Sequence, residues 1–174
     1  GTLQMRINKR SLEPLLLELG KATYIGQQFE FQLLIIVSLI SIKDETEPTK
    51  KFVIEYNKKN ELTLGRLTNI LKKHITLPEN YETLLSNGVE TRNFIAHGFL
   101  FSNAEMLGTE KGRRRLINEL IKAQIILDKC LSGTSSILEQ LIQHLGGNLE
   151  TILSKAQETY RRPRPLRRKK IIIA

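Results

Sequence analysis

A long amphipathic repeat near the start of the chain constrains the fold more than any other feature. From Leu12 to about Lys43, apolar or small residues recur every three or four positions: Leu15, Leu19, Ala22, Gly26, Phe29, Leu33, Ile36 and Ile40. This spacing places one apolar stripe on one face of a long α-helix, with Ser11 as a suitable N-cap and Pro14 in the first turn. Residues 33–37 are almost all apolar, so we expect this stretch to be covered on two sides, by another helix or a second subunit.

The rest of the chain also favours helices. Helical patterns cover Thr63–His74 and Glu79–His97, and a third runs from Thr109 or Glu110 to about Leu131. Ser132–Ser135 should interrupt or kink this third helix, which resumes to Leu145, and a last helix is expected over Leu149–Tyr160. The sequence therefore predicts an all-α bundle of four or five helices over residues 1–160, followed by a basic tail over 161–174.

Two segments between these helices are expected to be loops. Asp44–Asn60 is charged and contains Pro48, although Phe52–Ile54 within it could pair briefly as a strand. Gly98–Gly108 is the second expected loop.

Composition favours a cytoplasmic protein without metal or cofactor. The single Cys130 cannot form an internal disulfide, and the first residues contain no apolar signal segment. The most apolar run, Leu33–Ile40, is too short to span a bilayer. His74 and His144 have no companion ligands nearby in the sequence, and no glycine lies in a phosphate-binding loop pattern.

The net charge of +9 is concentrated at one end of the chain. Seven basic residues and no acidic ones lie in the tail: Arg161, Arg162, Arg164, Arg167, Arg168, Lys169 and Lys170. Without them, 20 basic residues face 18 acidic ones, so the body carries a net charge of only +2. Such a tail is either a solvated extension or a binding segment for the phosphates of a nucleic acid.

An arginine interrupts the apolar face of the helix predicted over Glu79–His97. Arg92 falls within the arc of apolar residues Tyr81, Leu84, Leu85, Val89, Ile95, Ala96 and Phe99. A buried guanidinium is costly unless a carboxylate, a carbonyl or an anion satisfies it. Asn93 and His97 lie one turn apart on the flank of this face, and Gly98 can end the helix. We therefore expect a guanidinium, an amide and an imidazole to converge there, as a functional site or as a structural cluster.

The run Arg92-Asn-Phe-Ile-Ala-His97, followed by Gly-Phe-Leu-Phe, resembles the signature of the HEPN superfamily. In that signature an arginine, usually followed by a polar residue, precedes a histidine by a few positions, and Arg92, Asn93 and His97 fill these places. The layout over roughly Leu12–Leu145 is also similar, with a long first helix that carries Gly-Gln-Gln-Phe-Glu in its middle.

The resemblance implies an α-helical bundle that dimerises about a two-fold axis and brings two copies of the motif together. Many HEPN proteins are metal-independent endoribonucleases of toxin–antitoxin, phage-defence and CRISPR systems, whereas others are inactive binding modules. The resemblance thus implies a homodimeric ribonuclease with Arg92, Asn93 and His97 as catalytic residues and RNA as substrate. The alternatives are a non-catalytic module that binds RNA or docks a partner such as a nucleotidyltransferase-type antitoxin, and a purely structural helical dimer.

The residue types suit metal-free RNA cleavage. Histidine titrates near neutrality and can transfer protons, while the planar donor fork of arginine suits a phosphate. Glu30, at the border of the first apolar stripe, is either the partner of Arg92 or an ordinary flanking acid. Arg113, Arg114 and Arg115 could contact an RNA backbone or could form a solvated face. One chain carries one such histidine, so an acid and a base together require two copies.

Overall fold

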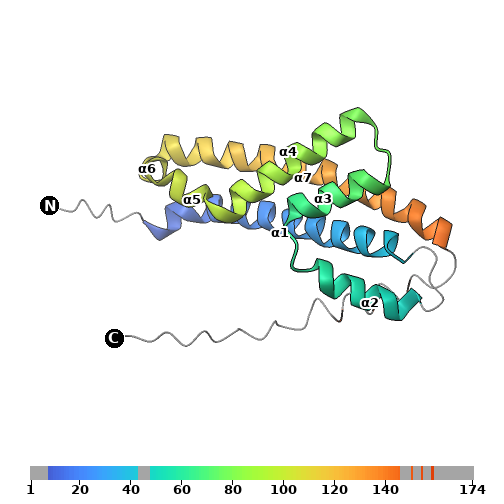
Figure 1. Ribbon diagram of the computed structural model, residues 1–174. Helices are drawn as coiled ribbons and strands as arrows, with labels where there is room; N and C mark the ends of the chain where they lie inside the picture. Colours follow the sequence, from blue (N-terminus) through green and yellow to red (C-terminus); the bar gives the residue numbers. More distant parts are fainter. Residues whose placement is uncertain (1–7, 43–47, 146–149, 151–153, 155–157, 159–174) are drawn as a thin grey trace, which may run out of the picture.

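The computed structural model describes residues 8–42 and 48–145, together with residues 150, 154 and 158. Within this part of the chain it is an all-α bundle with seven helices and no strands (Figure 1). The helices are α1 (Lys9–Ile40), α2 (Pro48–Lys59), α3 (Leu64–His74), α4 (Glu79–His97), α5 (Phe99–Ser102), α6 (Ala104–Leu107) and α7 (Glu110–Leu145). The basic tail and nearly all of the predicted helix over Leu149–Tyr160 lie outside the described residues.

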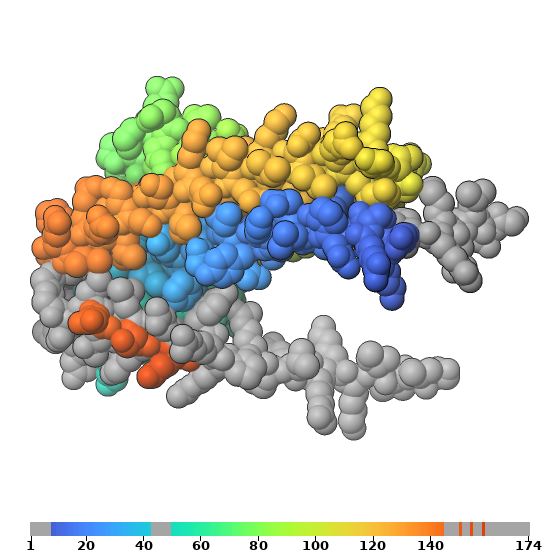
Figure 2. Space-filling model, turned by 180° about the vertical axis from the view of Figure 1, so that it is seen from behind, coloured from blue at the N-terminus to red at the C-terminus, as the bar shows by residue number. Residues whose placement is uncertain are grey.

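Two long helices form the frame of the bundle. α1 and α7 run side by side in the same direction along the length of the molecule (Figures 1 and 2). Gln124 on α7 donates to Glu18 on α1, and further along Gln32 on α1 is hydrogen-bonded to both Thr134 and Ser135 on α7. These amides and hydroxyls satisfy one another between the helices, where an unpaired polar group would be costly.

The apolar stripe of α1 forms the centre of the core. Leu15, Ala22 and Phe29 are fully buried, and every residue from Leu33 to Leu39 is buried, so the predicted covering on two sides is confirmed within one chain. The N-cap of α1 is Asn8, three residues before the expected Ser11, and the Asn8 side chain accepts a hydrogen bond from the Arg10 amide. By length and composition α1 could also cross a membrane, but half of its qualifying stretch is buried inside the bundle, as in a core helix.

The prediction of a loop over Asp44–Asn60 was wrong for residues 48–59, which form α2. Proline is favoured in the first turn of a helix, where its missing N–H needs no partner, so Pro48 begins α2 rather than preventing it. Phe52 and Tyr56, one turn apart, are both fully buried, with ring centroids 6.0 Å apart. The helical period of this aromatic pair, rather than the apolar run at residues 52–54, indicated the correct structure.

Glu55 adds electrostatic support on the other side of α2. It forms ion pairs with Lys51, Lys58 and Lys59, at the spacing of adjacent helical turns. The hydrogen bond from Lys59 lowers the pKa of the Glu55 carboxyl below its usual value. The carboxylate therefore stabilises the fold above its unfolded-state pKa, and this contribution is lost as the pH falls through the lower folded-state pKa.

Two further expectations about helix boundaries were also wrong. Residues 99–107, expected as a loop, form the one-turn helices α5 and α6. α7 continues without a break through Ser132–Ser135. The hydroxyl of Thr134 donates to the Leu131 carbonyl and to Gln32, so it supports the helix and its packing instead of ending it. A Cβ atom at Gly133 would collide with the ring of Tyr81 on α4, so the packing of the two helices requires a small residue there.

Candidate functional site

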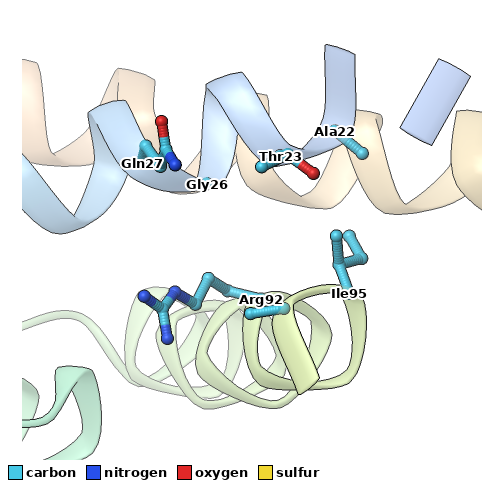
Figure 3. Close-up of a pocket in the computed structure, with 7 residues that line it drawn as sticks. Ala22, Thr23, Gly26, Gln27, Arg92 and Ile95 are labelled. Atoms are coloured by element: carbon cyan, nitrogen blue, oxygen red, sulfur yellow. The ribbon is translucent and has the colours of Figure 1, made fainter. Parts of the chain in front are cut away.

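The candidate site lies where α4 crosses α1, and Arg92 is its central residue. The Arg92 side chain is 22% exposed and runs along the groove between the two helices, with its guanidinium on the Gln27 side of Gly26 (Figure 3). On α1, Glu30 forms an ion pair with Arg92 and accepts a hydrogen bond from its Nη2. The cation within the apolar face of α4 therefore has a carboxylate partner on the facing helix.

Gly26 allows Arg92 to lie this close to α1. A Cβ atom at position 26 would lie 3.3 Å from Cγ of Arg92 and 3.6 Å from Cδ1 of Leu127 on α7. An alanine there would require the arginine stem to shift slightly, and a larger side chain would displace it further. The sequence pattern placed Gly26 in the apolar stripe but did not indicate that an arginine packs against it.

In the structure Arg92 contacts Asn93, whereas the His97 side chain forms no hydrogen bond with either residue. Nη1 of Arg92 donates to Oδ1 of Asn93 over 3.4 Å, and Asn93 is exposed. His97, in the last turn of α4, is also exposed, and its imidazole forms no hydrogen bond with any described residue. It lies five positions after Arg92 on the helix, so the two side chains project from α4 in different directions. Within one chain, a hydrogen bond therefore joins only Arg92 and Asn93, and His97 lies one helical turn after Asn93.

Two adjoining hollows follow the groove between α1 and the end of α4. The first, of about 50 Å³, is called here the Arg92 hollow, and its lining residues are Ala22, Thr23, Gly26, Gln27, Arg92, Ile95 and Ala96 (Figure 3). The second, of about 230 Å³, is called the Phe101 hollow, and it is lined by Leu19, Ile95, Ala96, His97, Gly98, Phe99, Leu100 and Phe101. Ile95 and Ala96 line both hollows, so Arg92 and His97 border neighbouring parts of one groove.

Aromatic side chains surround the histidine end of this groove. Phe101 is 94% exposed and Phe94 is 46% exposed, whereas Phe99 is buried. Phe94 packs edge-on against Phe99, with ring centroids 5.6 Å apart. The sequence contained a signal for this surface in the Phe-Leu-Phe run after Gly98, but helical periodicity alone could not show that Phe101 projects into solvent.

The arginine triplet lies at the start of α7, and its members have different partners. Arg113 donates to the Leu107 carbonyl over 2.8 Å, whereas Arg114 and Arg115 pair with Glu110 and Glu119 on α7. Arg113 and Arg114 also line an open hollow of about 400 Å³ between the starts of α1 and α7. The triplet is thus partly neutralised, and the remaining predicted basic residues, in the tail, lie outside the described residues.

Other reactive residues do not join the site. Cys130 is buried, its thiol donates to the Leu84 carbonyl, and burial raises its pKa to about 11. The thiol is therefore protonated at neutral pH and unsuited to act as a nucleophile. Nδ1 of His74 is 2.9 Å from the Ile70 carbonyl. Among the described residues, no three His, Cys, Asp or Glu side chains are grouped as metal ligands.

No protein-family model, curated protein or solved structure matches this chain. The function proposed below therefore depends on the residues of the groove and on their chemistry.

Proposed function

We propose that this protein is a HEPN-like, metal-independent endoribonuclease that acts as a homodimer, with Arg92, Asn93 and His97 of both copies in the active site. The observation that supports this proposal most strongly is the exposure of Arg92 and His97 along one groove. Arg92 is held in place by Glu30 yet remains 22% exposed beside a hollow, and His97 is exposed on the same groove. Because it is exposed there, the imidazole of His97 is accessible to a substrate and to a second copy.

In this proposal Arg92 stabilises the charge of the phosphorane. Its planar guanidinium offers five donors, of which the ion pair with Glu30 and the contact with Asn93 use only part. Glu30 fixes the direction of the fork, so the remaining donors are oriented before the substrate arrives. Such preorganised donors stabilise developing charge more effectively than mobile ones.

His97 supplies the proton transfers. The imidazole of one copy removes the proton from a ribose 2′-hydroxyl, whose oxygen attacks the adjacent phosphorus. The imidazolium of the other copy donates a proton to the departing 5′-oxygen. The products are a 2′,3′-cyclic phosphate and a free 5′-hydroxyl, and no oxidant, reductant or metal takes part. Because a single imidazole cannot be deprotonated and protonated at once, this scheme requires two copies of His97.

The exposed side of α1 provides a surface for the second copy. Leu16, Leu17 and Tyr24 are 47%, 59% and 62% exposed, on the helix that forms one wall of the groove. Large apolar side chains on one exposed helix face are typical of protein–protein contacts. A second copy bound there would lie beside the groove that carries Arg92 and His97.

Replacing Arg92 by alanine tests the role assigned to the guanidinium. In excess EDTA, kcat/KM for RNA cleavage should fall by at least about 10²-fold, because loss of one charge-stabilising donor has effects of this size. Arg92→Lys keeps the charge but not the fork, so it should restore only part of the activity. We would measure kcat/KM with labelled RNA for each variant and check its helix content by circular dichroism. Unchanged cleavage by a folded Arg92→Ala variant would contradict the proposal.

The second candidate function is a non-catalytic module that docks a protein partner such as a nucleotidyltransferase-type antitoxin. It is favoured by the same exposed apolar face of α1 and by the low net charge of +2 outside the basic tail. The EDTA assay separates the two functions, since a docking module would leave RNA intact at every enzyme concentration.

A further inference from the structure

The Phe101 hollow suggests which form of RNA the site accepts. We propose that Phe101 stacks on an unpaired nucleobase next to the scissile phosphate, so that the enzyme selects single-stranded RNA. This inference depends on the proposed ribonuclease function and identifies its substrate class.

Phe101 is exposed to a degree that packing does not explain. Its side chain is 94% exposed, the highest value among the large apolar residues of the described chain, although it lies in a fixed part of the fold. α5 is anchored by Phe99, which is 3% exposed and packs edge-on against Phe94 of α4. The backbone that carries Phe101 is therefore fixed, so little of its conformational entropy is lost when a ligand covers the ring.

The shape and lining of the hollow fit one flat ring. Its volume is about 230 Å³, with Leu19, Ile95 and Phe99 among its apolar lining residues and His97 as the titratable one. A hollow of this size can receive a single base. A base stacked on Phe101 would place its ribose and phosphate near His97, where the proposed proton transfers take place.

The charge around this end of the bundle favours a polyanion over an apolar protein partner. α5, α6 and the starts of α1 and α7 gather at the same end (Figure 1). At this end the basic residues outnumber the acidic ones: Lys9, Arg10, Lys111, Arg113 and Arg114 against Glu13, Glu105 and Glu110. Phosphates that follow the stacked base would pass through this positive region.

Stacking on Phe101 requires a base whose face is free. In an RNA duplex each base is stacked and paired, and its face is not available to a side chain. A single strand can turn one base outward, and an aromatic platform accepts any base because every base has a flat π-face. The enzyme should therefore bind single strands of mixed sequence more tightly than the corresponding duplex.

Binding of an uncleavable RNA separates this inference from catalysis. The probe is a short fluorescein-labelled oligonucleotide with 2′-O-methyl groups throughout, which lacks the attacking hydroxyl. Its affinity is measured by fluorescence anisotropy for the full-length protein, as a single strand and as a duplex. Phe101→Ala should weaken single-strand binding by about fivefold or more, and Phe101→Trp should preserve it. Ile125→Ala, at another exposed apolar position (51% exposed), is the matched control and should bind as the wild type does.

The possible results distinguish the stacking role of Phe101 from the ribonuclease function. If the wild type cleaves RNA and Phe101→Ala binds single strands unchanged, the inference fails while the ribonuclease function stands. If the wild type neither binds nor cleaves any RNA, both fail. If Phe101→Ala instead converts a dimer into a monomer in light scattering, the ring belongs to a protein interface and the stacking role is refuted. Equal binding of single strands and duplexes by the wild type would also overturn it.

Discussion

Replacing His97 by alanine should reduce RNA cleavage in excess EDTA by about 10³-fold or more and leave the stability of the fold nearly unchanged. General acid–base catalysis contributes about 10²–10⁴-fold, and in the proposed dimer this single change removes both the acid and the base. Stability should change by about 0.5 kcal/mol or less, because His97 is exposed and has no hydrogen bond with the described residues.

The control for this experiment is another exposed histidine near a helix end. His144 lies in the last turn of α7, so His144→Ala changes the same residue type without touching the groove. We expect it to cleave RNA at the wild-type rate. Cleavage rates with labelled RNA and urea unfolding curves for both variants measure the two effects. A folded His97→Ala variant with wild-type activity would remove the histidine from the mechanism.

Replacing glycine by alanine should change the stability of the fold in opposite directions at two helical positions, and this is the second large effect. Gly133→Ala should destabilise the protein by about 2 kcal/mol, whereas Gly20→Ala should stabilise it by up to about 1 kcal/mol. Alanine favours helices over glycine at both positions. However, a Cβ atom at position 133 would lie only 2.1 Å from Cε2 of Tyr81. A Cβ atom at position 20 would have no neighbouring side chain or helix within 4 Å.

The cost at position 133 arises from displacement of Tyr81. Its ring would have to leave the seam between α4 and α7, and its hydroxyl would lose the 3.1 Å hydrogen bond to the Cys130 carbonyl. Urea unfolding at one fixed protein concentration gives both stabilities. In a Tyr81→Ala background the clash is absent, so Gly133→Ala should no longer destabilise. A destabilisation that persisted there would show that the ring is not its cause.

The main helices could be predicted because their sequence patterns are long and strongly periodic. The stripe of α1 and the pattern of α4 extend over many turns, and such patterns are dominated by burial against the core. α2 was missed because charge and a proline were given more weight than the one-turn spacing of Phe52 and Tyr56. The continuity of α7 was missed because the run Ser132–Ser135 was interpreted as an interruption, although tertiary contacts require a small residue at position 133.

The candidate site could be predicted only in part. The position of Arg92 within an apolar face indicated that it needs an anionic partner, and Glu30 lies on the helix that faces it. The close approach of Gly26 to Arg92 depends on how α1 and α4 cross, which no local pattern specifies. The same limit applies to His97 and Phe101, because sequence spacing gives their direction from the helix but not what lies opposite them.

The composite active site is tested most directly by mixing two forms of the protein. Wild-type and His97→Ala chains are combined in varying proportions, allowed to exchange subunits, and assayed for RNA cleavage in excess EDTA. If each site needs both histidines, only dimers of two wild-type chains are active, so an equal mixture should retain about a quarter of the wild-type rate. A rate that falls in simple proportion, with about half remaining in the equal mixture, would show that one His97 suffices and would contradict the shared site.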